Sequence, residues 1–566
     1  MLQTQQNFVD YLGQLDSLAQ KARLDKDKSK LIASLKEREL LIPVVGGFSA
    51  GKSSALNDFL GENILSVAIT PETALATELR WTAGESYAEC VKDNDSVEKI
   101  AISNLDLLKN RAGEFKYLRL YLNNQKLKDI EPLILVDMPG FDAPLELHNK
   151  AIMEYLQRGI YFIILESAES GTIAMSIKKH IDSLQTLGRD FSFCLSKVDI
   201  VEPDTLDGIK NKMISDLKKE FGYDKGITLL GKNLNRGEAL QKIIEQINAE
   251  QLFDKLYRDE LKMDFIDTKS SLTTKISSLK ATKEEADEAI KELDNAIKKI
   301  ERTRENLEQA HFDVQSEVNS SLNAIDRALI ADKDALAEVV VKDKDIFANK
   351  IAETIRGTLL NEFIRKGKEQ RESLINKYKL ELNELNLPSN FKLDSQWVND
   401  LTDSIAHILK NVSINTYDYG EWIEKYGRAF ISVAEILKNI ISKIIIFPWL
   451  KIAIPIVISA AKGLVGVLAK LFGGARVNAD DMMAKILPEI RKNLEPEISK
   501  SYKEQIEAVR EAIALMLKAK FEEKQGEIQK AQAQKAEIAK SAESEIGNLN
   551  AIGTELDSLA TKYLYK

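Results

Sequence analysis

The chain has 566 residues, which is long for one hydrophobic core and favours two or more domains. Its 44% apolar and 30% charged residues exclude a disordered chain, a collagen-like chain and a many-pass membrane protein. With 79 basic and 88 acidic residues the net charge is −9, so a general nucleic-acid binder is not expected.

Cysteine and histidine are scarce. Cys90 and Cys194 lie far apart, so we expect neither a disulfide framework nor a cysteine-rich zinc site, and the four histidines are scattered. The first residues, Met1–Gln6, contain no basic stretch followed by an apolar run, so we expect no secretory signal. By default we expect a cytoplasmic protein.

The first predicted element is an amphipathic helix over residues 5–36. Apolar side chains recur there at intervals of three and four residues, at Phe8, Leu12, Leu15 and Leu18. Such a stripe is typical of a helix that packs against other helices.

Short apolar and β-branched runs dominate residues 38–250, and each lies close to a turn or a helical stretch. The runs are Leu40–Val45, Ala76–Thr82, Phe115–Leu122, Leu133–Val136, Tyr161–Leu165, Phe191–Leu195 and Ile227–Leu230. Strands that alternate with helices predict an α/β domain with a mostly parallel sheet.

Residues Gly46–Ser53 fit the pattern G-x-x-x-x-G-K-S in full. They follow the first predicted strand and precede the helical run Ala55–Leu60. A glycine-rich turn that matched the pattern by chance would rarely stand between a strand and a helix in this way. In such a loop the backbone N–H groups turn inward around phosphates. We therefore expect Lys52 to reach the β- and γ-phosphates and the Ser53 hydroxyl to bind Mg²⁺.

Two further motifs follow predicted strands. Asp137–Gly140 reads Asp-Met-Pro-Gly, so Asp137 can hold Mg²⁺ through water and Gly140 can offer its N–H to a γ-phosphate. In Ser196–Asp199 the Lys197 stem can pack on a base, and Asp199 can accept from the two donors of guanine, which adenine lacks. Each motif alone is also an ordinary turn, but three in this order at strand ends support one another.

Helical patterns dominate the rest of the chain. Residues Glu238–Arg356 contain neither glycine nor proline, the strongest helix breakers. Apolar residues keep a three-four spacing there and again near the C-terminus, for example at Ile506, Val509, Ile513 and Met516. Long packed helices are predicted.

Residues 441–474 form the most apolar segment. Its longest uncharged run, residues 452–461, is well short of the roughly 18 residues of a spanning helix. Six basic residues and no acidic one lie between Ile436 and Ala479, although the whole chain is acidic. We expect partial insertion into an anionic leaflet, with the lysines at the headgroups. The alternative is the buried core of a helical bundle.

The expected membrane contacts are Phe447, Trp449, Lys451, Ile454, Val457, Lys462 and Phe472. Pro448 and Pro455 would interrupt a single rod-like helix here. This favours a short apolar tip over a spanning segment.

With these residues in view, the chain resembles a GTPase of the dynamin superfamily, closest in layout to compact bacterial dynamin-like proteins of the LeoA type. Its loop Gly46–Ser54 resembles the dynamin version, in which Ser49 is the extra serine. Pro71-Glu72-Thr73 resembles the bacterial dynamin switch segment, and Gly231-Lys232-Asn233 loosely resembles the fifth motif.

The resemblance implies a set of functional residues. Ser49, Lys52 and Thr73 would be catalytic, and Ser53, Thr73 and Asp137 would hold Mg²⁺. The nucleotide-binding residues would be Gly46, Gly47, Phe48, Ser49, Ala50, Gly51, Lys52, Ser53, Ser54, Asp137, Gly140, Lys197, Asp199 and Lys232.

One departure concerns catalysis. Eukaryotic dynamins carry glutamine where this chain has Phe48, and no glutamine follows Gly140, where Phe141 and Asp142 stand. Hydrolysis would then depend on Ser49, Thr73 and backbone groups, completed by a partner GTPase domain or a monovalent cation, as the family implies. We expect slow turnover by the isolated monomer.

The predicted fold is an α/β P-loop GTPase domain plus an extended all-α helical bundle with an apolar membrane-interacting tip. The predicted parts are residues 1–37 (N-terminal helix of a neck), 38–250 (GTPase domain), 251–440 (neck and trunk), 441–474 (apolar tip) and 475–566 (returning helices).

The expected function is GTP hydrolysis coupled to membrane binding and remodelling, through fission, fusion or vesicle release. The expected partners are an anionic membrane and a second copy, or a related dynamin-like protein, bound through the GTPase domain; no nucleic acid is expected. The protein would be cytoplasmic and peripherally membrane-associated. Two alternatives remain: a GTP-regulated tether or scaffold with little hydrolysis, and a soluble P-loop signalling switch with a buried apolar hairpin.

Overall fold

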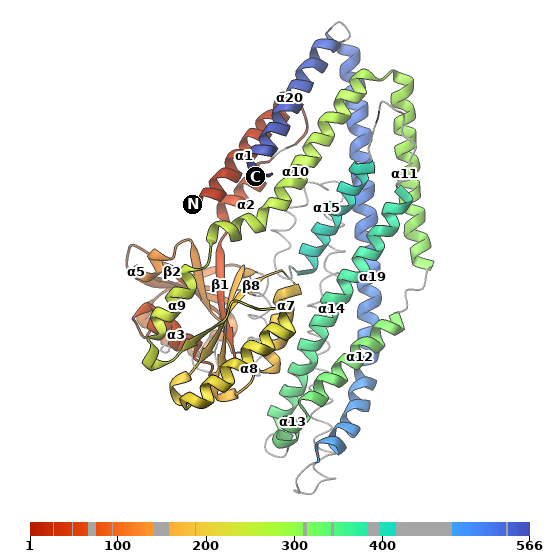
Figure 1. Ribbon diagram of the computed structural model, residues 1–566. Coiled ribbons are helices and arrows are strands. Elements are labelled where there is room, and N and C mark those ends of the chain that lie inside the picture. The colour runs from red at the N-terminus through yellow and green to blue at the C-terminus, as the bar shows by residue number, and fades with distance from the viewer. Residues whose placement is uncertain are drawn as a thin grey trace.

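The structure, a computed structural model, combines an α/β domain with a body of long helices (Figure 1). It describes residues 1–26, 28–47, 49–65, 75–92, 94–140, 155, 158–186, 188–309, 314–340, 344–382, 391, 395–414, 478–538 and 541–565. The predicted combination of an α/β domain and a helical bundle is confirmed, whereas the apolar tip at 441–474 lies outside the described residues.

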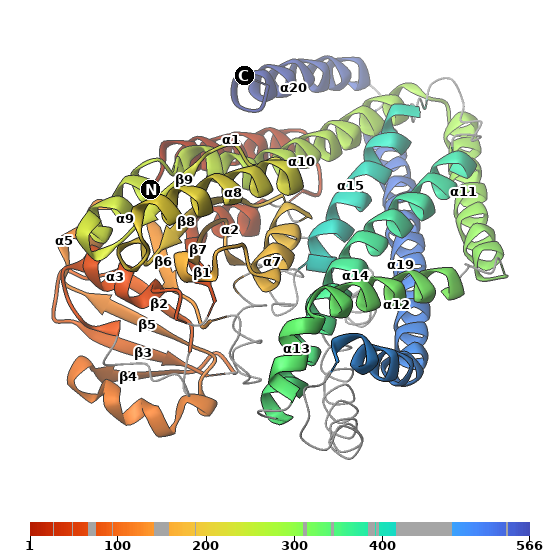
Figure 2. The same cartoon turned by 60° about the horizontal axis from the view of Figure 1, so that its bottom comes forward.

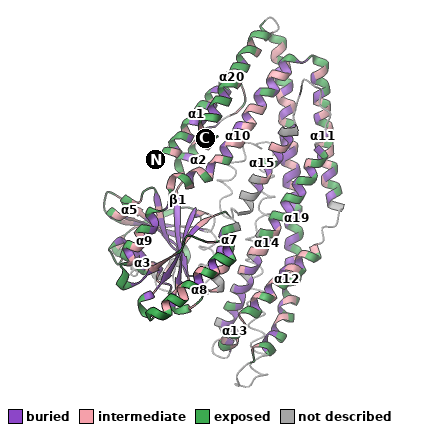
Figure 3. Cartoon of the chain, viewed as in Figure 1, coloured by how far each residue is buried: buried purple, intermediate pink, exposed green. Residues whose placement is uncertain are grey.

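The described strands form one nine-stranded sheet in the order β4-β3-β5-β2-β6-β1-β7-β8-β9. Their bounds are β1 Leu40–Gly46, β2 Thr77–Trp81, β3 Tyr87–Val91, β4 Val97–Ala101, β5 Tyr117–Leu122, β6 Leu133–Asp137, β7 Tyr161–Ser167, β8 Asp190–Ser196 and β9 Ile227–Leu230. Strands β6, β1, β7, β8 and β9 run parallel, and β2 pairs parallel with β5. The mostly parallel sheet is thus confirmed, and its strands are largely buried (Figure 3).

The hairpin of β3 and β4 lies at one edge of the sheet and was not among the predicted strands. It pairs antiparallel with β5, and β2 pairs antiparallel with β6. Exposed and half-buried residues alternate along β4, which carries Glu98 and Lys99. A polar edge strand of this kind has no continuous apolar run, so the sequence pattern does not reveal it.

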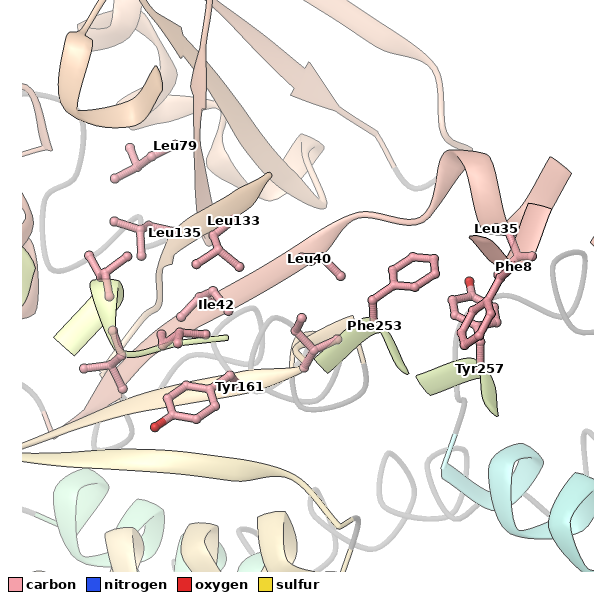
Figure 4. Packing of buried hydrophobic residues seen from close by; sticks show 14 of the residues in the cluster. Phe8, Leu35, Leu40, Ile42, Leu79, Leu133, Leu135, Tyr161, Phe253 and Tyr257 are labelled. Atoms are coloured by element: carbon pink, nitrogen blue, oxygen red, sulfur yellow. The ribbon is translucent and has the colours of Figure 1, made fainter. Parts of the chain in front are cut away.

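Helices cover both faces of the sheet. Those of the α/β domain are α3 Lys52–Leu60, α5 Gln125–Asp129, α7 Met175–Thr186, α8 Pro203–Phe221 and α9 Arg236–Glu245. Short 3₁₀ segments are η1 Ile102–Asn110, η2 Ala112–Glu114, η3 Ala168–Ser170, η4 Val198–Ile200 and η5 Lys232–Leu234. One face of the sheet packs against the first helices of the chain. Leu40 and Ile42 of β1 belong to the same buried apolar cluster as Phe8 and Phe253 (Figure 4).

The helical body contains α10 Ala249–Lys280, α11 Lys283–Gln309, α12 Val314–Ala331, α13 Lys333–Val340, α14 Lys344–Leu382, α15 Ser395–Ile414, α19 Ala479–Glu537 and α20 Ala542–Tyr563. Helices α11, α12, α14 and α15 pack beside the long α19 (Figures 1 and 2). The other face of the sheet joins this body, because one apolar cluster runs from Ile164 of β7 through Ile177 of α7 to Ile351 of α14. The long helices expected from the glycine-free and proline-free stretch are confirmed.

The single helix predicted for residues 5–36 is wrong, because two helices occupy this stretch, α1 Gln3–Lys21 and α2 Ser29–Glu37. Arg23, with φ of 51°, adopts the left-handed backbone conformation that follows the end of α1. The chain between the two helices then places Lys26 and Lys28 beside acidic residues of α10 and α19. Periodicity alone does not reveal such a break, since the apolar spacing resumes in α2.

Lys26 lies in a partly buried ionic cluster where the first helices meet the helical body. Its ammonium is 2.6 Å from Asp267 of α10 and 2.7 Å from Glu523 of α19, and Lys520 contacts the same two carboxylates at 3.1 and 2.7 Å. Burial raises the pKa of Asp267, but the charges of Lys26 and Lys520 outweigh burial and hold that pKa well below its usual range. The cluster therefore stabilises the fold at neutral pH and loses its effect well below about pH 4.

We expect Asp267→Asn to lower the free energy of unfolding by about 2 kcal/mol at neutral pH, because two nearly buried lysines then share one carboxylate. Chemical denaturation followed by circular dichroism measures this change. The control is Asp25→Asn, in the same segment between α1 and α2. Asp25 is exposed, and its ion pair with Lys530 should contribute less than about 0.5 kcal/mol to the free energy of unfolding. Equal effects of the two variants would contradict the structural role of the cluster.

Among the described helices, none combines the length and the apolar character that crossing a lipid bilayer requires. The predicted membrane contacts between Phe447 and Phe472 lie outside the described residues and stay a prediction.

Candidate functional site

The loop between β1 and α3 is shaped by two glycines. A Cβ on Gly46 would lie 2.3 Å from the carbonyl oxygen of Leu165 on β7, so a side chain does not fit there. Gly51 has φ of 83° and precedes the first residue of α3. Ser49 also adopts a left-handed conformation, with φ of 59°. This backbone closes the loop against β7 and leaves the N-terminus of α3 directed at its centre.

Lys52 directs its ammonium group back into this loop. The side chain is 7% exposed, and Nζ donates to the carbonyl oxygens of Gly46 at 3.1 Å and Gly47 at 2.9 Å. A positive charge thus lies within the curve of the loop, next to the N–H groups at the start of α3. This arrangement suits the oxygen atoms of a polyphosphate.

Ser53 and Asp137 lie together at the edge of the loop. The Ser53 hydroxyl donates to Oδ2 of Asp137 at 2.7 Å, and Asp137 is 3% exposed. Burial raises the pKa of Asp137 to about 6, although the Ser53 hydrogen bond and the Lys52 charge lower it. Its Oδ1 has no hydrogen-bond partner among the described residues. A buried carboxylate oxygen of this kind, beside a serine hydroxyl, fits a Mg²⁺ ion and its water shell.

Strand β2 pairs with β6, the strand that ends in Asp137. It runs antiparallel to β6, and Thr77 is the residue opposite Asp137. Gly140, three residues beyond Asp137, is buried. Phe48 and Thr73 lie outside the described residues, so their expected roles stay predictions.

The Ser196–Asp199 motif lies on the other side of the loop. The Ser196 hydroxyl donates to the carbonyl oxygens of Ala50 at 2.7 Å and Glu166 at 3.1 Å, so it ties the end of β8 to the loop and to β7. Lys197 has φ of 55°, and its ammonium pairs with Glu169 of η3. Neither Ser196 nor Glu169 was among the predicted site residues.

Asp199 is exposed, and its Oδ1 accepts from the backbone N–H of Lys232 at 3.1 Å. Gly231 leaves the space for this contact, since a Cβ there would lie 2.9 Å from Cγ2 of Val198. The structure thus joins the Ser196–Asp199 and Gly231–Asn233 segments at one rim. Ser54, the third residue of α3, is exposed.

Comparison with known protein families identifies this arrangement. Residues 42–198 match the profile of the dynamin family. Over these residues the chain resembles the GTPase domain of the dynamin family. The expected resemblance to bacterial dynamin-like GTPases is confirmed, and the enzyme is a GTP hydrolase. The dynamin-family domain implies GTP as the nucleotide and Mg²⁺ as its usual metal ion.

Similar proteins of known sequence are distant. Dynamin-like protein 2 of Campylobacter jejuni subsp. jejuni serotype O:23/36 (strain 81-176) is 26% identical over 201 residues, which cover 35% of this chain and 32% of that protein. An uncharacterized protein in the xynA 3′ region of Caldicellulosiruptor sp. (strain Rt8B.4) is 20% identical over 285 residues, 47% of this chain and 69% of that protein. The chain therefore matches only about a third of the dynamin-like protein's length.

Two solved structures are similar over most of their length. LeoA, a bacterial dynamin GTPase from ETEC, is 13% identical with a TM-score of 0.31, covering 99% of this chain and 98% of LeoA. A chain from an oligomerised bacterial dynamin pair is 13% identical with a TM-score of 0.34, covering 94% and 92%. At these scores the likeness carries no argument about function.

In the dynamin-family domain we expect Asp199→Asn to lower GTP affinity about 100-fold, because an amide oxygen accepts without the negative charge that strengthens both bonds to guanine. Asparagine can still accept from the Lys232 N–H, so the rim should keep its shape. Titration with fluorescent GTP and ATP measures the change in preference. Asp204→Asn, at an exposed aspartate of α8, is the control. Equal affinity of the unaltered protein for ATP and GTP would contradict the assignment.

Proposed function

We propose that this GTPase couples GTP binding and hydrolysis to the binding and remodelling of membranes, through fission, fusion or vesicle release. One observation carries the nucleotide half: the loop Gly46–Ser53 curves around the Lys52 ammonium beside the Ser53–Asp137 hydrogen bond. The dynamin-family domain and the basic segment between Ile436 and Ala479 support the membrane half.

In this proposal the nucleotide lies along the loop and the ends of β6 and β8. Lys52 and the N–H groups of the loop bind the β- and γ-phosphates, and Ser54 lies next to them on α3. Ser53, Asp137 and Thr73 hold Mg²⁺, which neutralises phosphate charge when bound. Gly140 offers its N–H to the γ-phosphate.

The base would lie between two lysines. Asp199 accepts from guanine, the stem of Lys197 packs on the ring, and Lys232 closes the rim through its backbone. The Lys197 ammonium pairs with Glu169, and the proposal needs only the methylene stem of Lys197 for packing on the base.

Hydrolysis depends on positioning an attacking water, and this chain lacks the glutamine at position 48 that eukaryotic dynamins use. We assign that role to Ser49 and Thr73 with backbone groups, completed by a second GTPase domain or by a monovalent cation. The isolated monomer would then turn over slowly, and self-association through the GTPase domain would accelerate it.

The membrane contact is assigned to residues 441–474, with Phe447, Trp449 and Ile454 among the inserted side chains and Lys451 and Lys462 at the headgroups. The protein would act at the cytoplasmic surface of an anionic membrane, as a peripheral protein. No nucleic-acid partner is proposed, because the chain is acidic.

Co-sedimentation with vesicles, together with phosphate release, tests the proposal. We expect the protein to pellet with vesicles of anionic phospholipid but not with zwitterionic ones, and GTP turnover to rise when such vesicles are present. Pelleting independent of lipid charge would contradict the headgroup role of the lysines. Absence of pelleting in both the nucleotide-free and the GTP-analogue state would contradict membrane binding.

The second candidate is a GTP-regulated tether or assembly scaffold. The lack of a glutamine at Phe48 and after Gly140 favours it, since slow hydrolysis leaves the GTP-bound state long-lived. Phosphate release separates the two: a tether would bind vesicles in the GTP state without faster turnover, whereas a remodelling enzyme would hydrolyse faster on the membrane.

A further inference from the structure

Glu78 of β2 is a charged residue in the interior of the α/β domain that none of the nucleotide motifs includes. It is fully buried, with 0% of its side chain exposed. It lies one residue after Thr77, which is opposite Asp137, and is itself opposite Val136 of β6. Its carboxylate thus lies beside the strand that ends in the proposed Mg²⁺ ligand. A buried charge at this point requires partners, because burial without them is very costly.

Two partners of Glu78 belong to the chain that precedes β7. The Tyr155 hydroxyl donates to Oε1 of Glu78 at 2.7 Å, and Nη2 of Arg158 donates to the same oxygen at 3.0 Å. Tyr155 is fully buried, and its ring meets the Tyr117 ring edge-on at 6.0 Å between centroids. The Arg158 guanidinium lies 4.8 Å from the Tyr117 ring centre. One carboxylate oxygen therefore fixes both side chains to β2.

The remaining partners belong to the sheet and its entrance. Nε of Arg80 donates to Oε2 of Glu78 at 2.9 Å, and Arg119 of β5 is 3.5 Å from that oxygen. Arg80 also binds Glu39, just before β1, at 2.6 Å. Glu89 of β3 pairs with Arg119 at 3.7 Å. Three carboxylates and three guanidiniums thus meet in one cluster with Glu78 at its centre.

The residues of this cluster stand next to functionally important segments in the sequence. Glu78 follows the segment that contains Thr73, and Tyr155 and Arg158 follow the segment that leaves Asp137–Gly140. Along the chain, Glu78, Tyr155 and Arg158 thus each follow a segment that the proposal assigns to the γ-phosphate and Mg²⁺, and in the fold these three residues meet. A displacement of Tyr155 and Arg158 relative to β2 must break their hydrogen bonds to the fully buried carboxylate of Glu78, and an unpaired buried carboxylate is costly.

We propose that Glu78 is a positioning residue of the GTPase: together with Tyr155 and Arg158 it couples the two chain segments that contact the γ-phosphate, and so favours the triphosphate over the diphosphate. The inference rests on the proposed nucleotide site. GDP has no γ-phosphate and therefore lacks the γ-phosphate contacts that the coupled segments would supply. Loss of the coupling therefore affects the GTP-bound state selectively.

The primary test is Tyr155→Phe, which removes the hydroxyl that binds Glu78 and keeps the ring that packs on Tyr117. We expect the affinity for a non-hydrolysable GTP analogue with Mg²⁺ to fall about fivefold, with GDP affinity unchanged. Titration with fluorescent analogues of both nucleotides measures the ratio of the affinity for the GTP analogue to the affinity for GDP. A purely structural role would lower the melting temperature and leave the ratio as it is in the unaltered protein.

Two further variants complete the test. Glu78→Gln keeps the shape of the carboxylate and loses its charge, and where it remains folded it should lower the ratio more than Tyr155→Phe does. Glu89→Gln is the matched control, because Glu89 contacts Arg119 in the same cluster but neither Tyr155 nor Arg158. Its nucleotide preference should stay unchanged.

The outcomes distinguish this inference from the proposal on which it rests. If the unaltered protein bound neither nucleotide, the nucleotide site itself would be wrong. If it bound both, and Tyr155→Phe kept the ratio or lost both affinities equally, only the positioning role would be refuted. A selective loss in Glu89→Gln as large as in Tyr155→Phe would refute it too.

Discussion

Replacing Lys52 by alanine is expected to lower GTP affinity by at least about 100-fold and to abolish measurable hydrolysis. The ammonium group lies within the loop, 3.1 and 2.9 Å from the carbonyl oxygens of Gly46 and Gly47. Alanine removes the positive charge of the Lys52 ammonium from the phosphate site. The backbone N–H groups of the loop and of the N-terminus of α3 remain to bind the phosphates. Nucleotide titration and steady-state phosphate release measure the two losses.

The fold should survive Lys52→Ala. The Gly47 carbonyl is at the partly exposed loop, so water can replace the lost donor there. A melting temperature close to that of the unaltered protein would confirm this. Lys255→Ala, at an exposed lysine of α10 whose pair with Asp190 is on the surface, is the matched control and should leave turnover unchanged. Normal turnover in Lys52→Ala would refute the phosphate-binding loop.

The second large effect is expected in the apolar segment. Substituting both Ile454 and Val457 with aspartate places two acids in its longest uncharged run. In a membrane-inserted tip each charge costs about 3 kcal/mol of insertion free energy, which together lowers membrane affinity by several orders of magnitude. We expect a folded, nucleotide-binding protein that no longer pellets with anionic vesicles.

A different loss would indicate a different role for this segment. In the core of a helical bundle the same two acids would be buried without partners, and the melting temperature would fall sharply. The control is the double variant Val97→Asp and Ile330→Asp, which adds the same charge at two exposed apolar positions, 49% and 45% exposed. Vesicle binding retained by Ile454→Asp/Val457→Asp would also contradict an inserted tip.

The phosphate-binding loop and the central strands could be predicted from the sequence because both depend on local requirements. Gly46 and Gly51 are needed where the backbone approaches β7 or turns left-handed, and those needs are met within eight residues of chain. The central strands can be recognised by their continuous apolar runs, because other elements of the fold cover both faces of the sheet there. Asp137 ends one such strand and Asp199 follows another, and because β6 and β8 run in the same direction, their location at the carboxyl ends of these strands also follows from the pattern.

Polar contacts between distant parts of the chain could not be predicted in this way. Ser196 belongs to a motif in the sequence, but its bond to the Ala50 carbonyl depends on how β8 packs beside the loop. Between α1 and α2, Lys26 binds Asp267 and Glu523, which lie hundreds of residues away in the sequence. The β3–β4 hairpin is at an edge where alternating polar residues weaken the apolar signal.

Glu78 shows the difference most clearly. In the sequence it is one acid in a short run that predicts a strand, where a charged residue would be expected to face water. Only the tertiary structure brings Arg80, Arg119, Tyr155 and Arg158 around it and makes its burial possible. The sequence by itself determined where phosphates can be bound, because a loop of adjacent residues provides that site. Which groups couple that loop to the rest of the domain was decided by packing, because the partners come from strands and loops whose proximity no local pattern specifies.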